Sequence, residues 1–355
     1  MTGRTNLTQR PHFKHVAIVG ATGAVGREFG VVLEQRRFPA QQYRLLASAQ
    51  SAGRTLPWCG RDLRVEALRP DSFEGCDLAL FSAGAAVSRE FGPCAARGGA
   101  VVIDNSSAFR MDADVPLVVP EVNAAAAFQH KGILANPNCS TIILAVVLWP
   151  LHRVNPIGRA VVATYQAASG AGARALAELE SQTRSVLAGQ APRPEIFPEP
   201  CAFNVFSHNS VLGPDGYNLE ETKLIRETRK IFGQPTDGPD SIQIAPTCMR
   251  VPVMRAHTEA VAIEFTRPMP EEEARILLAS APGVRLVDDR ERNHFPTPLE
   301  ATGADEVLVG RIRQDPTLPD GRGLQLLCSG DQLRKGAALN AVQIAELLLS
   351  GQASI

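Results

Sequence analysis

The sequence predicts an α/β protein of two domains, with a parallel sheet in the first domain and a mixed or antiparallel sheet in the second. Its 355 residues exceed what one hydrophobic core usually organises. The first third alternates short apolar runs with amphipathic stretches, which is typical of parallel strands joined by crossover helices. After residue 139, strand patterns follow one another without helices between them, and this indicates an α+β domain.

The first domain is expected to contain five buried strands and at least two crossover helices. The strands are predicted from apolar runs, at His15–Gly20, Tyr43–Ser48, Asp77–Gly84, Ala100–Asn105 and Gly132–Asn136. The helices are predicted from apolar residues at helical spacing, at Val25–Arg36 and Ser88–Arg97. We assign residues 1–138 to this domain and add 335–355, because the last helix is expected to complete it.

The second domain is predicted over residues 139–334. Its strands are expected at Arg159–Gln166, Cys248–Val253, His257–Thr266, Val284–Val287, Glu306–Ile312 and Leu324–Cys328. Its helices are expected at Ser140–Leu151, Ala171–Leu187 and Leu219–Ile231, and the final helix of the chain at Ala337–Leu349. The active site is expected in the cleft between the two domains.

Composition argues against several classes of function. The formal net charge is −1 and the basic residues are scattered, so no patch for nucleic acid or an anionic membrane is expected. The seven cysteines form no CxxC pair and no HExxH occurs, which predicts neither a metal site nor a disulfide framework. A polar N-terminus and the absence of a long apolar run predict a cytoplasmic protein.

A glycine-rich loop follows the first predicted strand and leads into a helix. Its spacing is GxxGxxG, and a turn this tight between strand and helix needs residues without Cβ atoms. Backbone amides at the helix start would then bind a dinucleotide pyrophosphate, which predicts a Rossmann-like domain. The expected contacts are Gly20, Thr22, Gly23, Ala24, Val25 and Gly26. The alternative is an ordinary glycine-rich turn.

The end of the second predicted strand bears on the choice of cofactor. NAD enzymes usually place a carboxylate there for the ribose hydroxyl, but this segment contains Gln50, Ser51 and Arg54 and no acidic residue. Small polar groups and an arginine suit a 2′-phosphate, so NADP is preferred to NAD. The alternative is that Arg54 is simply exposed in a turn.

Cys139 is the candidate nucleophile. It lies in a loop that runs directly into an apolar helix, and Asn138 and Ser140 are both plausible helix caps. A cysteine at a helix N-terminus lies in a positive potential that favours the thiolate. The other six cysteines are interpreted as small buried residues.

The segment Asn138–Thr141 resembles the active-site signature of aspartate-semialdehyde dehydrogenases. Further segments that resemble this family follow in the expected order, at Asp104–Met111, Gln166–Gly172, Glu220–Lys223, Arg250–Val253 with His257, and Leu333–Asn340. The resemblance extends from about Val16 to Leu348. It implies a glyceraldehyde-phosphate-dehydrogenase-like architecture, in which the second domain is catalytic and also forms a homodimer or homotetramer.

The resemblance also implies roles for the catalytic residues. Cys139 would attack the acyl carbonyl and form a thioacyl-enzyme. His257 would be the acid–base group, although a histidine at the start of a strand is more often structural. Gln166 would contact the substrate and orient the intermediate, and the alternative is an amide that bonds to a neighbouring loop.

Substrate and cofactor contacts follow from the same resemblance. Arg250 would bind the substrate α-carboxylate through its planar fork, and Glu220 would meet the ammonium group. Phosphate would be held by Arg110, Asn138 and Lys223. Cofactor contacts would include Ser169, Gly170 and Gln332, in addition to the glycine-rich loop, Gln50 and Ser51. Without the resemblance, Glu220 and Lys223 are an i, i+3 pair on a helix surface.

The implied activity is NADPH-dependent reductive dephosphorylation of L-aspartyl 4-phosphate to L-aspartate 4-semialdehyde. This reaction belongs to diaminopimelate, lysine, threonine and methionine biosynthesis. Two departures from the family pattern are Gln50, where many relatives carry a basic residue, and Gln332, where asparagine is common. The alternatives are an N-acetyl-glutamyl-phosphate reductase and a non-catalytic relative with the same fold.

Overall fold

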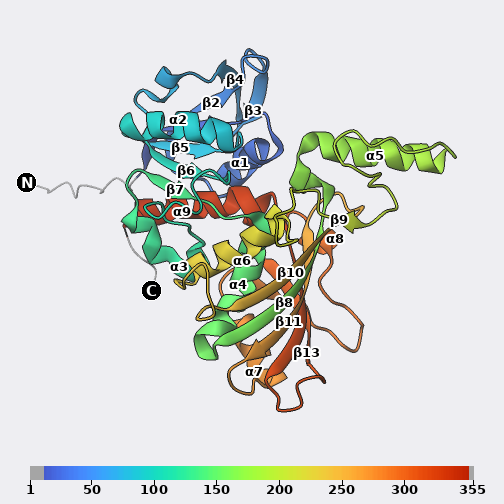
Figure 1. Ribbon diagram of the computed structural model, residues 1–355. Helices are drawn as coiled ribbons and strands as arrows, with labels where there is room; N and C mark the ends of the chain where they lie inside the picture. The colour runs from blue at the N-terminus through green and yellow to red at the C-terminus, as the bar shows by residue number, and fades with distance from the viewer. Residues whose placement is uncertain (1–11, 352–355) are drawn as a thin grey trace, which may run out of the picture.

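The computed structural model describes residues 12–351 of the chain. Two seven-stranded sheets organise it, one built from β1–β7 and the other from β8–β14. The first sheet occupies the upper part of Figure 1 and the second the lower part, with the C-terminal helix between them. The predicted domain ranges extend over residues 1–11 and 352–355, which lie outside the described residues, and the domain limits remain predictions.

The first sheet is parallel except at one edge. Its order is β3-β4-β2-β1-β5-β6-β7, and only β3 and β4 pair in antiparallel fashion. The strands are β1 (Phe13–Val19), β2 (Ala40–Ala47), β3 (Thr55–Trp58), β4 (Arg61–Ala67), β5 (Leu78–Phe81), β6 (Val101–Asp104) and β7 (Ile133–Ala135). The five predicted strands correspond to β1, β2, β5, β6 and β7, so the expected parallel sheet is confirmed.

Helices cover both faces of this sheet, as a doubly wound parallel sheet requires. They are α1 (Ala24–Gln35), α2 (Ala85–Arg97), α3 (Pro120–Asn123) and α9 (Leu339–Ser350), with short turns η1 (Pro70–Phe73) and η2 (Ala124–Gln129). The C-terminal helix α9 shares a hydrophobic core with β1, β2 and α1. The last helix therefore packs with the first sheet, although the chain reaches it only after the second sheet.

The second sheet is mixed, in the order β12-β13-β14-β11-β8-β10-β9. Its strands β8 and β10, and β12 and β13, pair in parallel, and the other neighbours are antiparallel. The strands are β8 (Ile157–Gln166), β9 (Phe206–Ser207), β10 (Gln243–Arg250), β11 (His257–Phe265), β12 (Val284–Leu286), β13 (Val307–Gln314) and β14 (Gly323–Gly330).

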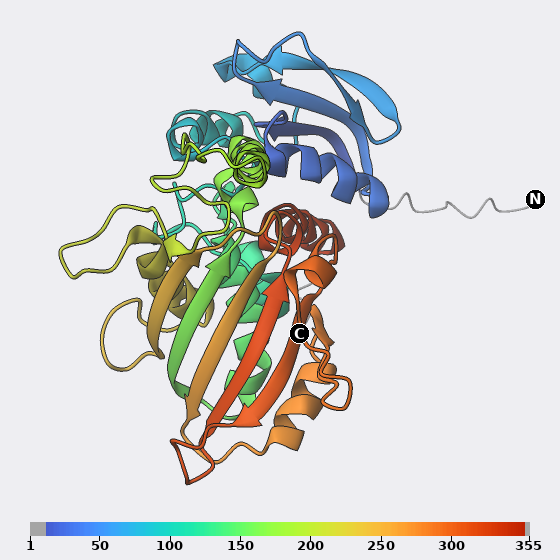
Figure 2. The ribbon, with the colours of Figure 1, turned by 90° about the vertical axis from the view of Figure 1, so that its right-hand side faces the viewer.

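One face of the second sheet is covered by helices and carries the core of this domain. The helices of this part of the chain are α4 (Cys139–Val154), α5 (Ala173–Leu187), α6 (Leu219–Ile231), α7 (Glu271–Ala279) and α8 (Pro298–Ala301), with η3 (Ala168–Ala171) and the π-helical η4 (Arg334–Ala338). Figure 2 looks onto the opposite face, where Val161 and Tyr165 of β8 are exposed.

Two predictions about strands were wrong. The β3–β4 hairpin was not predicted, and β10 begins five residues before the predicted start at Cys248. Pro246 lies within β10 and has no N–H to donate, which argued against a strand there. The strand tolerates it because its neighbour β9 pairs only with Met249 and Arg250, so the missing N–H falls beside no partner strand on that side.

Candidate active site

A cavity of about 880 Å³ lies between the two sheets. Gly23–Val25 at the start of α1 line one part of it, and Cys139, Gln166 and Arg250 line another. We call it the interdomain cavity. The carboxyl ends of β1 and β8 both lead to it, because Gly20 follows β1 and Gln166 ends β8. This is where a parallel nucleotide-binding sheet places its ligand.

The glycine-rich loop is packed so closely that two of its glycines have no room for a side chain. Gly20 has φ +85°, and a Cβ at Gly26 would lie 2.1 Å from the carbonyl oxygen of Gly20. Gly23 is the N-cap of α1 and provides no side-chain acceptor for the first amides of the helix. Those amides are therefore free to bind an anion at the positive end of α1.

The turn after β2 contains the residues expected near the ribose. Gln50 is exposed and Ser51 is half-buried, and the amide of Ser51 donates to the carbonyl of Ser48 at 2.9 Å. Arg54 is exposed just before β3. None of the three lines the cavity that contains Cys139.

Cys139 is the first residue of α4, as its sequence context predicts. The N-cap is Asn138, whose Oδ1 accepts from the amides of Ser140 at 3.0 Å and Thr141 at 3.3 Å. The Cys139 sulfur lies 3.5 Å from Nε2 of His257, which is the first residue of β11. The fold thus brings together a thiol and an imidazole that are 118 residues apart.

The ionisation of this pair differs from the expected thiolate. Burial and the Glu220 carboxylate raise the pKa of the Cys139 thiol to about 12, and Arg110 and the amide of Ser140 only partly oppose this. Burial and the Arg250 charge lower the pKa of His257 to about 3. Both groups are therefore neutral at pH 7, because desolvation outweighs the helix end.

The tautomer of His257 follows from the hydrogen bond at its Nδ1 atom. The amide of Ala167 donates to Nδ1 at 3.0 Å, so the hydrogen of the neutral ring is on Nε2, which faces the sulfur. Gly170 packs beside this ring, and a Cβ there would lie 3.3 Å from Nε2. Gly170 thus fits the site through its lack of a side chain.

Gln166 and Arg250 end two neighbouring parallel strands, β8 and β10. The Gln166 amide donates to the hydroxyl of Ser140 at 3.1 Å, on the helix that Cys139 begins. Arg250 is buried, and its Nε has no hydrogen-bond partner. Both residues line the interdomain cavity.

The three predicted phosphate contacts are held by acidic residues. Arg110 is buried and pairs with Glu227 at 3.0 Å, and the second oxygen of Glu227 accepts from the amide of Asn138 at 2.6 Å. The Asn138 side chain donates to Glu220 at 2.7 Å. Glu227 was not predicted, although it lies one helical turn beyond Lys223 on the same side of α6.

Glu220 and Lys223 are not the exposed pair that helix spacing alone suggests. Their charged atoms are 3.1 Å apart, but Glu220 is buried and both residues line the interdomain cavity. Burial tends to raise the pKa of Glu220, and Lys223 together with the Asn138 amide lowers it to about 2. Glu220 is therefore an anion that faces the site.

The C-terminal segment also reaches the nucleophile. Gln332 hydrogen-bonds to the hydroxyl of Ser169 and accepts from the amide of Ala256 at 2.8 Å, so the longer amide still lies in the cavity lining. Gly336, which was not predicted, packs directly on Cys139: a Cβ there would lie 2.9 Å from that of the cysteine. His208, also not predicted, accepts from Arg250 at 2.9 Å.

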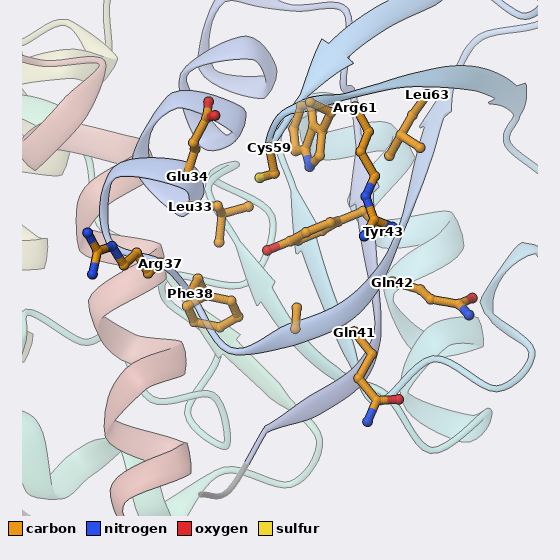
Figure 3. Close-up of a pocket in the computed structure, with 12 residues that line it drawn as sticks. Leu33, Glu34, Arg37, Phe38, Gln41, Gln42, Tyr43, Cys59, Arg61 and Leu63 are labelled. Atoms are coloured by element: carbon orange, nitrogen blue, oxygen red, sulfur yellow. The ribbon is translucent and has the colours of Figure 1, made fainter.

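A second cavity, of about 480 Å³, lies between α1 and the β3–β4 hairpin. The ring of Tyr43 extends into it toward Leu33 and Phe38 (Figure 3). None of the residues that line it also line the interdomain cavity.

Within residues 12–351, no helix is both long and apolar enough to cross a bilayer, and no cluster of acidic, histidine or cysteine side chains suits a metal ion.

Comparison with known proteins finds a matching family domain for each of the two parts of the chain. Residues 15–130 match the NAD binding domain of semialdehyde dehydrogenases, and residues 148–335 match the dimerisation domain of semialdehyde dehydrogenases. An aspartate-semialdehyde dehydrogenase from Synechocystis sp. is 54% identical over 94% of this chain and 97% of that protein. One from Bacillus subtilis is 46% identical over 94% of this chain and 97% of that protein.

Solved structures agree with this assignment. Aspartate semialdehyde dehydrogenase II from Vibrio cholerae, complexed with ASA, is 43% identical with a TM-score of 0.90, covering 96% of this chain and 98% of that one. The enzyme from Candida albicans with NADP is 25% identical with a TM-score of 0.74, covering 94% and 98%. The resemblance seen in the sequence is thus confirmed over nearly the whole length, and the chain belongs to the aspartate-semialdehyde dehydrogenase family.

Proposed function

We propose that this protein reduces L-aspartyl 4-phosphate to L-aspartate 4-semialdehyde through a thioacyl intermediate on Cys139. The observation that carries the proposal is the 3.5 Å approach of the Cys139 sulfur to Nε2 of His257, inside a cavity that Gln166 and Arg250 also line. Attack of the sulfur on the acyl carbon forms the thioester and breaks the bond from this carbon to the phosphate oxygen. Inorganic phosphate leaves and carries the thiol proton away. Hydride transfer to the thioester then gives a hemithioacetal, which collapses to the aldehyde and regenerates the cysteine.

His257 is proposed as the acid–base group that hydrogen-bonds to the Cys139 sulfur. Its Nε2–H faces Cys139, and such a donor stabilises both a thiolate and an oxyanion on the attacked carbon. His257 is buried and Cys139 is half-buried, and both groups are neutral, so the thiol proton must leave before or during attack. Gln166, held through Ser140 on α4, would orient the acyl group beside the sulfur.

Arg250 is proposed to bind the α-carboxylate of the substrate. It is a buried cation with an unpartnered Nε, and a planar guanidinium binds a carboxylate through two parallel hydrogen bonds. Glu220 is an anion facing the same cavity and would pair with the substrate ammonium. Arg110, Asn138 and Lys223, which also line this cavity, would hold the departing phosphate.

NADPH is proposed as the hydride donor. The free amides at the start of α1, in the tight turn that Gly20 and Gly26 allow, fit a pyrophosphate. Gln50 and Ser51, with no carboxylate in their turn, favour a 2′-phosphate. Ser169, Gly170 and Gln332, which line the cavity near Cys139, would contact the nicotinamide end.

We further propose that two copies associate through the open face of the second sheet. The family match names this region a dimerisation domain, and Val161 and Tyr165 are exposed on that face. Sedimentation analysis of the wild type and of Tyr165→Asp tests this proposal, and a variant that stays fully associated would contradict it.

Phosphate-dependent reduction of NADP and of NAD, with L-aspartate semialdehyde as substrate, tests the proposed activity. N-acetyl-L-glutamate semialdehyde is the matched comparison, since the related reductase uses the same nucleophile chemistry. The expected result is turnover of the first substrate with a preference for NADP. A preference for the acetylated substrate would overturn the assignment, and so would the absence of turnover with either one.

A further inference from the structure

Arg250 is a buried cation that no carboxylate of the described residues pairs with. Its Nη1 donates to the carbonyl of Ala167 at 2.7 Å and its Nη2 donates to Nε2 of His208 at 2.9 Å. The guanidinium carbon also lies 5.2 Å from the ring centre of Phe197. Every one of these partners is neutral, so the positive charge of Arg250 is left for a ligand.

His208 is the only side chain to which Arg250 donates a hydrogen bond, among residues 12–351. A guanidinium only donates, so Nε2 of His208 must accept and the hydrogen of the neutral ring is on Nδ1. Nδ1 lies 3.1 Å from the hydroxyl of Ser210, which becomes its acceptor. The amide of Ser210 also lies 3.3 Å from Nδ1, and it cannot donate there while Nδ1 carries the hydrogen. Burial, with the charges of Arg250 and Lys223, lowers the pKa of His208 to about 4, and the Glu220 carboxylate only partly opposes this. The ring is therefore neutral at physiological pH.

The hydroxyl of Ser210 continues the network to helix α6. It donates to Oδ1 of Asn218, the N-cap of α6, at 3.1 Å and accepts from the amide of Glu220 at 3.1 Å. One chain of hydrogen bonds therefore joins Arg250 to the first turn of the helix that presents Glu220 and Lys223. The direction of the bonds in this chain follows from Arg250, because a guanidinium can only donate.

We propose that His208 is a positioning residue that aims the guanidinium of Arg250 at the substrate carboxylate and couples it to α6. An imidazole suits this role because it accepts a hydrogen bond without adding charge. A carboxylate at the same place would pair with Arg250 and compete with the substrate, and a lysine would repel it. This inference rests on the proposed function, and it adds a residue that selects for the carboxylate end of the substrate.

Steady-state kinetics of two variants test the proposal. His208→Phe keeps a ring of similar shape but has no acceptor, whereas His208→Gln can accept through its amide oxygen. Because a hydrogen bond to a charged group is lost, His208→Phe should raise KM for L-aspartate semialdehyde roughly 10-fold or more, with kcat changed less than about 3-fold. His208→Gln should restore most of the affinity. Ser207→Ala, at the neighbouring exposed position that does not line the interdomain cavity, is the matched control.

Propanal, which has no carboxylate, distinguishes positioning from general disruption. If His208 acts through Arg250, kcat/KM for propanal should be the same in His208→Phe and the wild type. Equal losses with both aldehydes, or a lower kcat with unchanged KM, would overturn the proposal. Inhibition by L-2-aminobutyrate, which keeps the carboxylate, gives a second measure: its inhibition constant should rise with KM, and an unchanged constant would also overturn it. A wild type that does not use aspartate semialdehyde would instead refute the proposed function.

Discussion

Replacing Gly336 by alanine tests how tightly the C-terminal segment packs against the proposed nucleophile. Gly336 lies in the π-helical η4, and an added Cβ would be 2.9 Å from Cβ and 3.3 Å from Cα of Cys139. Ordinary contact begins at 3.4 Å, so one segment must move by about 0.5 Å. The backbone of Cys139 carries the sulfur with it, and the sulfur must keep its place beside His257.

The expected loss in kcat is about 10-fold, because a misplacement of roughly 1 Å in an active site can cost about 100-fold. The stability cost should be of similar size, since a 10-fold loss in kcat corresponds to about 1.4 kcal/mol. Overpacking costs roughly 1–3 kcal/mol, and alanine recovers roughly 0.5–1 kcal/mol relative to glycine in a helix. The free energy of unfolding of Gly336→Ala should therefore fall by about 1–2 kcal/mol.

Steady-state turnover and urea unfolding measure the two effects separately. The matched control is Gly30→Ala in α1, where an added Cβ would lie 3.0 Å from the ring of Trp58 and far from Cys139. This control should lose a similar amount of stability and keep its kcat. A Gly336→Ala variant with wild-type kcat would show that the packing on Cys139 does not set the position of the sulfur.

Three further predictions concern His257, the ion pair of Glu227 with Arg110, and the ionisation of Cys139. His257→Ala should lower kcat by roughly 10²–10⁴-fold with little change in NADPH affinity in a fluorescence titration; an unchanged kcat would remove His257 from the chemistry. Glu227→Gln should lower the free energy of unfolding in urea by about 3–5 kcal/mol, because Arg110 stays buried without its carboxylate; a wild-type urea midpoint would contradict this. Since the pKa of Cys139 is raised to about 12 and that of His257 lowered to about 3, alkylation of Cys139 should quicken about tenfold per pH unit from pH 6 to pH 9. A plateau near neutral pH would instead indicate a thiolate–imidazolium pair.

The parts of the fold that follow a periodic pattern were predictable from the sequence. The alternation of apolar runs and amphipathic stretches locates β1, β2, β5, β6 and β7, and the cap at Asn138 correctly places Cys139 at a helix start. The β3–β4 hairpin was missed because Pro57 and four charged residues in β4 obscure the alternation of Leu56, Trp58, Leu63 and Val65. Its turn is formed by Cys59 and Gly60, both with positive φ, and cysteine there is no usual turn signal.

The site was predictable only where a local pattern or the family resemblance named a residue. Glu227 could have been predicted from the sequence, since Glu220, Lys223 and Glu227 are spaced i, i+3 and i+7 on one helix face. His208 was not, because it follows a two-residue strand in a loop without periodicity. The pKa direction of Cys139 also could not be read from the helix start, because it depends on burial by Gly336 and on Glu220 brought from elsewhere in the chain.

Mass spectrometry of the protein mixed with L-aspartate semialdehyde and NADP, without phosphate, tests the central claim most directly. In the absence of phosphate the thioacyl-enzyme should accumulate, and peptide mapping should place the aspartyl adduct on Cys139 and nowhere on Cys139→Ala. An adduct on a different side chain, or no adduct while NADPH is being formed, would contradict covalent catalysis by this sulfur.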